Sequence, residues 1–364
     1  MIRNIDLSGC STACEVIGEG PPVLLIHGAE ADRRSFLRLS NALAEKVTVI
    51  SYDQRDCGES RTTQRPYGLA DLARDAAELI GALGYESAVV MGTSFGGRIA
   101  QMLAVSHPTI VKGLVLCNTW PLASSLKELH PEGQLRLRAA ADNLPGTAED
   151  LARMMYSDAY VNAHPECIDR MALKAAHPAR ALRRSLASEL HHGTFATRTL
   201  LLSGSLDKVV PTGVMRRFFA QLENSEFVEL AGVAHSMAVE APELLATHIS
   251  TFALSCDKGP LDIPSKRLIE LRCDIDELDA QIVSLLAERV RKTTDVGRIK
   301  ALSGEASIDP ERQTQRKAML GGLASKHDVD RLLLDEVYSV ISRWTVRNHE
   351  LLGAKPTPFH AQKT

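Results

Sequence analysis

A candidate nucleophile lies in the first third of the chain. Gly92-Thr93-Ser94-Phe95-Gly96 follows the apolar run SAVVM and precedes the amphipathic segment GRIAQMLAVSH. Glycines on both sides of a serine permit the sharp turn that presents a hydroxyl between a strand and a helix. Such a hydroxyl becomes a nucleophile when a histidine accepts its proton and an acid orients that histidine. The motif therefore predicts acyl transfer through Ser94.

The two side chains that this serine needs stand downstream. Asp207 comes shortly after the apolar run TLLLSG, and His235 comes shortly after EFVELAG. The carboxyl ends of parallel strands meet at one edge of a sheet, which is where ligands bind to open α/β sheets. We therefore expect Ser94, Asp207 and His235 to converge at that edge.

The elements that must position these residues follow a regular pattern. Short runs rich in β-branched residues alternate with helical stretches, which predicts parallel crossovers and an α/β doubly wound parallel sheet. The pattern lapses at about 121–197, where the sequence is helix-rich and has no convincing strand, so this segment is predicted to be a helical cap. The strand-like runs lie at residues 23–28, 47–53, 87–94, 113–119, 199–204 and 226–232.

Residues 1–254 resemble the α/β-hydrolase family through LLIHG, YDQRDCGES, GTSFGG, LLLSGSLDKVVP and GVAHSMAVEAPE, in family order. The resemblance implies that Ser94 is the nucleophile, His235 the general base and Asp207 its orienting carboxylate. It also implies an oxyanion hole made by the backbone N–H groups of Ala29 and Phe95. The family hydrolyses esters, lactones and related metabolites.

Two further positions bear on the substrate and on the acid. The segment SFGGRIA, which contains Arg98, is similar to the same segment of hydrolases that act on small carboxylated metabolites. The alternative is that Arg98 forms a salt bridge on a helix. Asn118 stands where some relatives carry an alternative acid. An amide cannot stabilise an imidazolium as a carboxylate does, so Asp207 remains the predicted acid.

A second candidate site lies after residue 254. Gly-Pro and Ile-Pro pairs at 259–260 and 263–264 indicate a linker at 255–264, followed by a helical domain at 265–351 and a tail at 352–364. On the first predicted helix, Arg289 and Lys300 lie about 20° and about 16 Å apart, so their side chains can converge on a small anion. Arg272 is rotated away by about 100° and reaches that position only from an antiparallel partner.

This region resembles the all-helical chorismate mutase family through LR, LLAER, VGRIK and DPER at fixed spacing. The resemblance implies an all-α three-helix domain and an intertwined homodimer that shares its sites. It implies a site for chorismate, with catalysis by Claisen rearrangement to prephenate. The chorismate-binding residues would be Arg289, Lys300, Asp309, Arg312, Gln313 and His349 together with the partner's Arg272.

Two of these positions depart from the family pattern. Gln313 replaces the usual glutamate after the DPER arginine, and His349 replaces the usual glutamine of the last helix. In the family that this region resembles, the residue at the first position normally recognises the ring hydroxyl and the residue at the second the breaking ether bond. The alternatives are therefore isochorismate, as a pyruvate lyase, or 4-amino-4-deoxychorismate. A catalytically silent binding or dimerisation module is a further alternative for one of the two domains.

Composition limits the remaining classes. The 364 residues carry 42 Lys and Arg against 45 Asp and Glu, a net charge of −3, which disfavours a nucleic-acid partner. No run approaches the ~18 apolar residues of a membrane span, and the start of the chain lacks a signal pattern. The seven cysteines are scattered, without a Cys/His cluster. We therefore expect a cytoplasmic enzyme without metal or cofactor, which acts on anionic small molecules.

Overall fold

The computed structural model describes residues 2–63, 65–174, 180–256 and 263–353, without the side chains of residues 180, 263–274, 276, 277 and 280. The chain divides into two compact units, Met1–Cys273 and Asp274–Thr364. The boundary falls inside a long helix. The linker predicted at 255–264 lies mostly outside the described residues.

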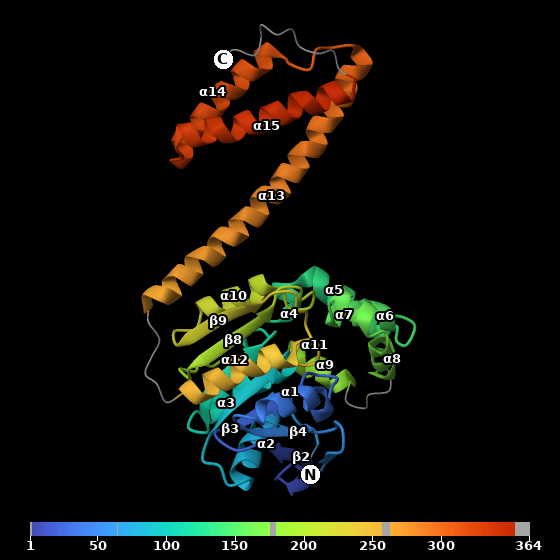
Figure 1. Ribbon diagram of the computed structural model, residues 1–364, viewed down its shortest axis with the longest axis vertical. Helices are drawn as coiled ribbons and strands as arrows, with labels where there is room; N and C mark the ends of the chain where they lie inside the picture. The colour runs from blue at the N-terminus through green and yellow to red at the C-terminus, as the bar shows by residue number, and fades with distance from the viewer. Residues whose placement is uncertain (1, 64, 175–179, 257–262, 354–364) are drawn as a thin grey trace. The chain divides into compact units, whose positions relative to one another are not determined.

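A nine-stranded sheet forms the centre of the first unit, within the described residues (Figure 1). The strand order is β1-β2-β4-β3-β6-β7-β8-β9, and β5 pairs with β2. The strands are β1 (Ile2–Asp6), β2 (Cys10–Ile17), β3 (Pro22–Ile26), β4 (Thr48–Tyr52), β5 (Arg61–Thr62), β6 (Ala88–Thr93), β7 (Val111–Cys117), β8 (Thr199–Gly204) and β9 (Ser225–Leu230). All six strands predicted from the sequence are present within two residues of the expected bounds.

The predicted parallel sheet is present, and antiparallel strands extend it at one edge. Strands β3, β4, β6, β7, β8 and β9 run parallel, whereas β1, β2 and β5 join them by antiparallel pairing. The sequence of β2, CSTACEVI, mixes small and polar residues, and it lacks the apolar run by which buried parallel strands are recognised. A strand near the edge needs no such run because solvent reaches part of it.

Helices cover both faces of this sheet, and the alternation of side chains along each strand explains why. In β3, Leu24 and Ile26 point to one core while Val23 and Leu25 point to the other. The first core is completed by α2 (Leu69–Ala82), α3 (Phe95–Ser106) and α10 (Thr212–Ala220). The second is completed by η1 (Arg33–Phe36), α1 (Leu37–Leu43), α11 (Met237–Glu240) and α12 (Pro242–Ser255).

The predicted cap is present as a run of helices between β7 and β8 (Figure 1). It comprises α4 (Leu126–Leu129), α5 (Pro131–Asp142), α6 (Ala148–Met155), α7 (Asp158–Ala163), α8 (Glu166–Leu173) and α9 (Arg180–Ser188). Arg98 of α3 anchors both ends of the cap, because it donates to Pro121 O (2.8 Å), to Leu122 O (3.2 Å) and to Glu189 O. Burial lowers the pKa of Arg98 to about 10. The alternative of a salt bridge on its own helix is therefore wrong.

The second unit consists of α13 (Ile263–Ser303), which begins in the first unit, α14 (Pro310–His327) and α15 (Arg331–Leu351). The three helices predicted from the sequence are all present. The Asp309 carboxylate caps α14 by accepting Arg312 N–H at 3.0 Å. Many of the described apolar side chains in this unit face solvent, among them Ile275, Leu278, Ile282 and Leu285 of α13.

Candidate active sites

Ser94 occupies a strained turn between β6 and α3. Its φ is +53° and its ψ is −122°, a conformation that costs a residue with a side chain about 1–3 kcal/mol. The turn brings backbone atoms very close to its two glycines. A Cβ at position 92 would overlap Gly96 O, and a Cβ at position 96 would overlap Ile26 O. Glycine is therefore required on both sides of Ser94, which lies at the N-terminus of α3 and remains partly exposed.

Ser94, His235 and Asp207 form a continuous hydrogen-bonded chain. Ser94 Oγ lies 3.0 Å from His235 Nε2, and His235 Nδ1 lies 2.8 Å from Asp207 Oδ2. The other Asp207 oxygen accepts the N–H groups of Val209 (2.7 Å) and Val210 (2.9 Å). Because a carboxylate only accepts, His235 Nδ1 carries the proton, and Nε2 is left free to accept the serine proton. The three side chains predicted from the sequence are the ones that meet.

Asn118 fixes the loop that carries His235. Its side-chain amide donates to Ala234 O and to His235 O, each at 3.0 Å, and its oxygen accepts Gly204 N–H at 2.9 Å. These contacts join the end of β7 to the end of β8 and to the histidine loop. Asn118 has a φ of +44° and is fully buried. The sequence excluded Asn118 as an acid, and its position after β7 was the signal that could have indicated a positioning role.

The two residues predicted to form the oxyanion hole lie near Ser94. Phe95 is the first residue of α3 and is buried, so its N–H belongs to the unpaired first turn of that helix. A Cβ built on Gly28 would lie 3.6 Å from Ser94 Cβ, which places the Gly28-Ala29 peptide beside the nucleophile. His27 Nδ1 lies 2.9 Å from Gly28 O. The C=O and N–H of a trans peptide point in opposite directions, so Ala29 N–H points away from the His27 ring.

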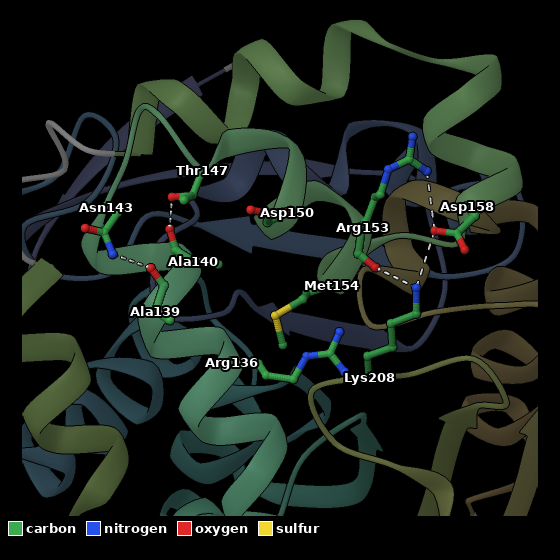
Figure 2. A pocket seen from close by; sticks show the side chains of 10 residues that line it. All are labelled: Arg136, Ala139, Ala140, Asn143, Thr147, Asp150, Arg153, Met154, Asp158 and Lys208. Atoms are coloured by element: carbon green, nitrogen blue, oxygen red, sulfur yellow. Dashed lines mark hydrogen bonds and ion pairs between the residues drawn. The ribbon is translucent and has the colours of Figure 1, made fainter.

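A cavity of about 600 Å³ opens on the cap between α5 and α6. Figure 2 shows Met154 and Arg136 among the side chains that line the cavity, and it shows Lys208 bonded to Arg153 O (3.0 Å) and Asp158 (3.4 Å). Lys208 follows Asp207 in sequence. Of the described residues that line the cavity, none belongs to the Ser94-His235-Asp207 chain.

In the second unit, several of the predicted anion-binding residues lie near one another. Arg289 is half-buried, and its Nη1 is buried without a hydrogen-bond partner among the described residues. Burial lowers the pKa of Arg316 most, and the positive charges of Arg289 and Arg312 lower it further. Arg316 is therefore close enough to Arg289 and to Arg312 for both of their charges to act on it. Their charges would be balanced by an anion.

Arg316 was not predicted from the sequence. It lies four residues after Arg312, on the same face of α14, and that spacing was a signal that could have identified it. It also donates to Ser342 Oγ of α15 at 2.5 Å. The Asp309 side chain is used as a helix cap, and Gln313 is exposed on the first turn of α14.

Lys300 and His349 both contact the turn between α13 and α14. Lys300 Nζ donates to Ala306 O at 2.9 Å and to Ser307 O at 3.3 Å, which leaves one N–H for a ligand. His349 is buried, with Nε2 2.9 Å from Thr293 O and Nδ1 3.4 Å from Ser307 O. Both ring nitrogens thus face backbone carbonyls within the unit. The Arg272 side chain lies outside the described residues.

Two kinds of feature are absent from the described residues. No group of three or more His, Cys, Asp or Glu side chains in the described part of the chain is arranged to hold a metal ion. No helix in the same described ranges combines the length and apolar character needed to cross a membrane.

Comparison with known proteins agrees with this division into two units. Residues 21–155 match the sequence model of the α/β hydrolase fold, and residues 271–350 match that of chorismate mutase type II. A protein of Serratia proteamaculans named as the carbamate hydrolase RutD is 28% identical over 244 residues, which is 63% of this chain and 91% of that protein. The fluoroacetate dehalogenase of Burkholderia sp is 30% identical over 135 residues, 35% of this chain and 43% of that enzyme.

Among solved structures, a malate-bound esterase of Thermogutta terrifontis superposes with a TM-score of 0.61 at 24% identity. The match covers 70% of this chain and 99% of the esterase. Together with the sheet and the position of Ser94, this likeness defines the first unit as an α/β hydrolase fold. The chain thus joins an α/β hydrolase fold to a helical unit that matches the chorismate mutase type II model.

Proposed function

We propose that the first unit is a serine hydrolase that acts on a small ester, lactone or related carboxylated metabolite. The observation that carries the proposal is the hydrogen-bonded chain from Ser94 through His235 to Asp207. The carbamate hydrolase among its relatives supports cleavage at an acyl carbon. The esterase among its structural neighbours shares the fold alone.

The geometry supports a two-stage acyl transfer. Ser94 Oγ attacks the carbonyl carbon while its proton passes to His235 Nε2, and the carbonyl π electrons move to the oxygen facing the Ala29 and Phe95 N–H groups. Collapse of this intermediate expels the leaving group, which takes the proton from His235. Water then attacks the acyl-serine, with His235 again as base, and releases the acid and free Ser94. Asp207 stays ionised throughout and stabilises the imidazolium.

Labelling with a fluorophosphonate tests this assignment. The wild type should hydrolyse p-nitrophenyl acetate and incorporate one phosphonate per chain, and Ser94→Ala should lose both. Phosphonate incorporation that persists in Ser94→Ala would overturn the assignment of the nucleophile. Carbamates, lactones and carboxylated esters, compared by kcat/KM on the wild type, would then identify the substrate class.

We propose further that the second unit is a chorismate mutase, which converts chorismate to prephenate. This rearrangement needs no nucleophile, because the enzyme has only to hold a folded dianion and stabilise charge on the ether oxygen. The cluster of Arg289, Arg312 and Arg316 supports carboxylate binding, and the remaining N–H of Lys300 suits the ether oxygen.

Isochorismate and 4-amino-4-deoxychorismate are alternative substrates, because Gln313 and His349 differ from the residues usual at these positions in the family. Incubation of the full chain with each compound, followed by mass spectrometry, separates the possibilities. Prephenate from chorismate supports the mutase, and pyruvate from isochorismate supports the lyase. No turnover of any of the three, with ester hydrolysis intact, would identify the second unit as a silent binding or dimerisation module.

We also propose that the chain forms a homodimer through the second unit. Leu285 is 66% exposed, Leu302 90% and Leu332 74%, values that are high for leucines in a three-helix unit. A second copy covering these faces would remove this apolar surface from water, at about 25 cal/mol per Å². Sedimentation of the full chain should show a dimer, and a monomer at micromolar concentration would refute the proposal.

A further inference from the structure

The cap contributes one fully buried arginine to the catalytic half of the first unit. Arg183 of α9 has no exposed surface, and its guanidinium lies over the Phe95 ring at 5.6 Å from the ring centroid. It donates to Gln54 Oε1, to Arg55 O and, at 3.2 Å, to Cys57 Sγ. Its Nε is buried without a partner among the described residues. These hydrogen-bond partners are all uncharged, so no carboxylate among them accounts for the burial of this cation.

The contact with Gln54 leads directly to the oxyanion hole. Gln54 Nε2 donates to His27 O at 2.7 Å, and Gln54 N–H donates to His27 Nε2 at 3.2 Å. His27 Nε2 is therefore an acceptor, so the ring proton is on Nδ1, which donates to Gly28 O at 2.9 Å. This last bond fixes the peptide whose N–H belongs to Ala29.

We infer that Arg183 is a positioning residue for the oxyanion hole, and that it acts through Gln54, His27 and the Gly28-Ala29 peptide. The inference rests on the proposed hydrolase function. A chain of hydrogen bonds with every member held from both sides fixes the direction of its last N–H more tightly than packing alone. Because Arg183 belongs to the cap, the oxyanion hole is complete only when α9 is docked on the sheet.

The same chain explains why a cation is suited to this position. An amide whose oxygen accepts from a guanidinium becomes a stronger donor at its nitrogen, since successive hydrogen bonds polarise one another. The hydrogen bond from Gln54 Nε2 to His27 O is thus strengthened by Arg183. A lysine at position 183 would keep the charge. It lacks the planar fork that reaches both Gln54 Oε1 and Arg55 O.

Arg183→Ala tests the inference by chemical rescue. Loss of one direct oxyanion donor lowers kcat about 10²–10³-fold, so loss of an indirect support should lower kcat about tenfold to hundredfold. The KM for p-nitrophenyl acetate should change little. Added guanidinium chloride at millimolar concentration should restore part of kcat by filling the vacated site, whereas equal sodium chloride should not. Rates are normalised to active sites by phosphonate titration.

A trifluoromethyl ketone inhibitor separates positioning from general damage to the fold. Ser94 Oγ adds to its carbonyl carbon, the proton goes to His235, and the new oxyanion occupies the hole. Arg183→Ala should weaken this inhibitor by the same factor that it lowers kcat, and Gln54→Ala should act non-additively with it. Arg170→Ala, which removes an exposed cap arginine paired with Glu166, is the matched control and should leave both values unchanged.

The outcomes distinguish this inference from the proposed function. A wild type without esterase activity or Ser94 labelling would refute the hydrolase itself. An active wild type with an equally active Arg183→Ala, or an inhibitor affinity that does not follow kcat, would overturn the role of Arg183 alone. If Arg183→Ala does not fold, Arg183→Lys and Gln54→Glu provide the same kinetic comparison.

Discussion

Asp207→Asn should reverse the direction of the hydrogen bonds that activate Ser94. One oxygen of Asp207 accepts two backbone N–H groups, from Val209 and Val210, and the other faces His235 Nδ1. In the variant, the amide oxygen must stay with the two N–H groups, because the amide nitrogen would oppose two donors. The amide nitrogen then donates to His235 Nδ1. The imidazole proton moves to Nε2, which can no longer accept the serine proton.

The size of this effect follows from the tautomer. In serine proteases, the same change at the orienting aspartate lowers kcat by about 10⁴. Here the two backbone donors hold the amide in the unfavourable orientation, so we expect a loss of about 10⁴, which corresponds to about 5 kcal/mol. The assay is kcat/KM for p-nitrophenyl acetate, with the phosphonate labelling rate as a second measure. The melting temperature should change little, since the side-chain volume is conserved.

Asp158→Asn is the matched control for this experiment. Asp158 is an exposed carboxylate of the cap that pairs with Lys208 and Arg153, and an exposed pair contributes little. Its amide variant should keep activity within about twofold. If Asp207→Asn retained more than a tenth of the wild-type kcat/KM, the inferred proton position on His235 would be incorrect.

Three other predictions concern stability and assembly. The pKa of Asp71 is lowered, first by a hydrogen bond from the backbone N–H that begins α2, so its stabilisation is present above pH 3.8 and lost as pH falls below it. Asp71→Asn should therefore cost about 1 kcal/mol at pH 7 and less at pH 3, by urea unfolding. Gly297→Ala should lower the melting temperature because its Cβ would meet the ring of His349 at 2.6 Å, whereas Gly322→Ala, with open space, should gain about 1 kcal/mol of helix propensity. Mixed Arg272→Ala and Arg289→Ala subunits should regain mutase activity in heterodimers, and no recovery despite subunit exchange would exclude a shared site.

The parallel part of the sheet and the helical unit were predictable because each rests on a local pattern. Buried parallel strands require continuous apolar runs, and these runs gave β3, β4, β6, β7, β8 and β9. The fixed spacing of LR, LLAER, VGRIK and DPER likewise indicated the helical unit of α13, α14 and α15. Strand β2 was not predicted because its sequence has no apolar run, and it is recognisable as a strand only by its pairing with β1, β4 and β5. Pairing depends on a neighbour in space, which no local pattern encodes.

The reacting side chains were also predictable, since glycines and strand ends mark them in the sequence. The residues that orient them were not. Asn118 is 116 residues from the carbonyl of Ala234 that it binds, and Arg183 is 129 residues from Gln54. Each is a single polar residue without a neighbouring motif, so only the folded chain reveals its partner.

His349 of the second unit also has contacts that the sequence did not predict. Its alignment with a family position that contacts the ether bond predicted a donor facing the substrate, whereas in the folded unit both ring nitrogens meet backbone carbonyls. The residue therefore lies between α13 and the turn at Ser307, and that turn also binds Lys300. Through this turn His349 supports the placement of the ammonium group that we assign to the ether oxygen. A residue that replaces a family member's ligand-binding side chain can thus act indirectly. Here His349 contacts the backbone of the turn at Ser307, and the same backbone accepts a hydrogen bond from Lys300, whose ammonium group is the proposed donor.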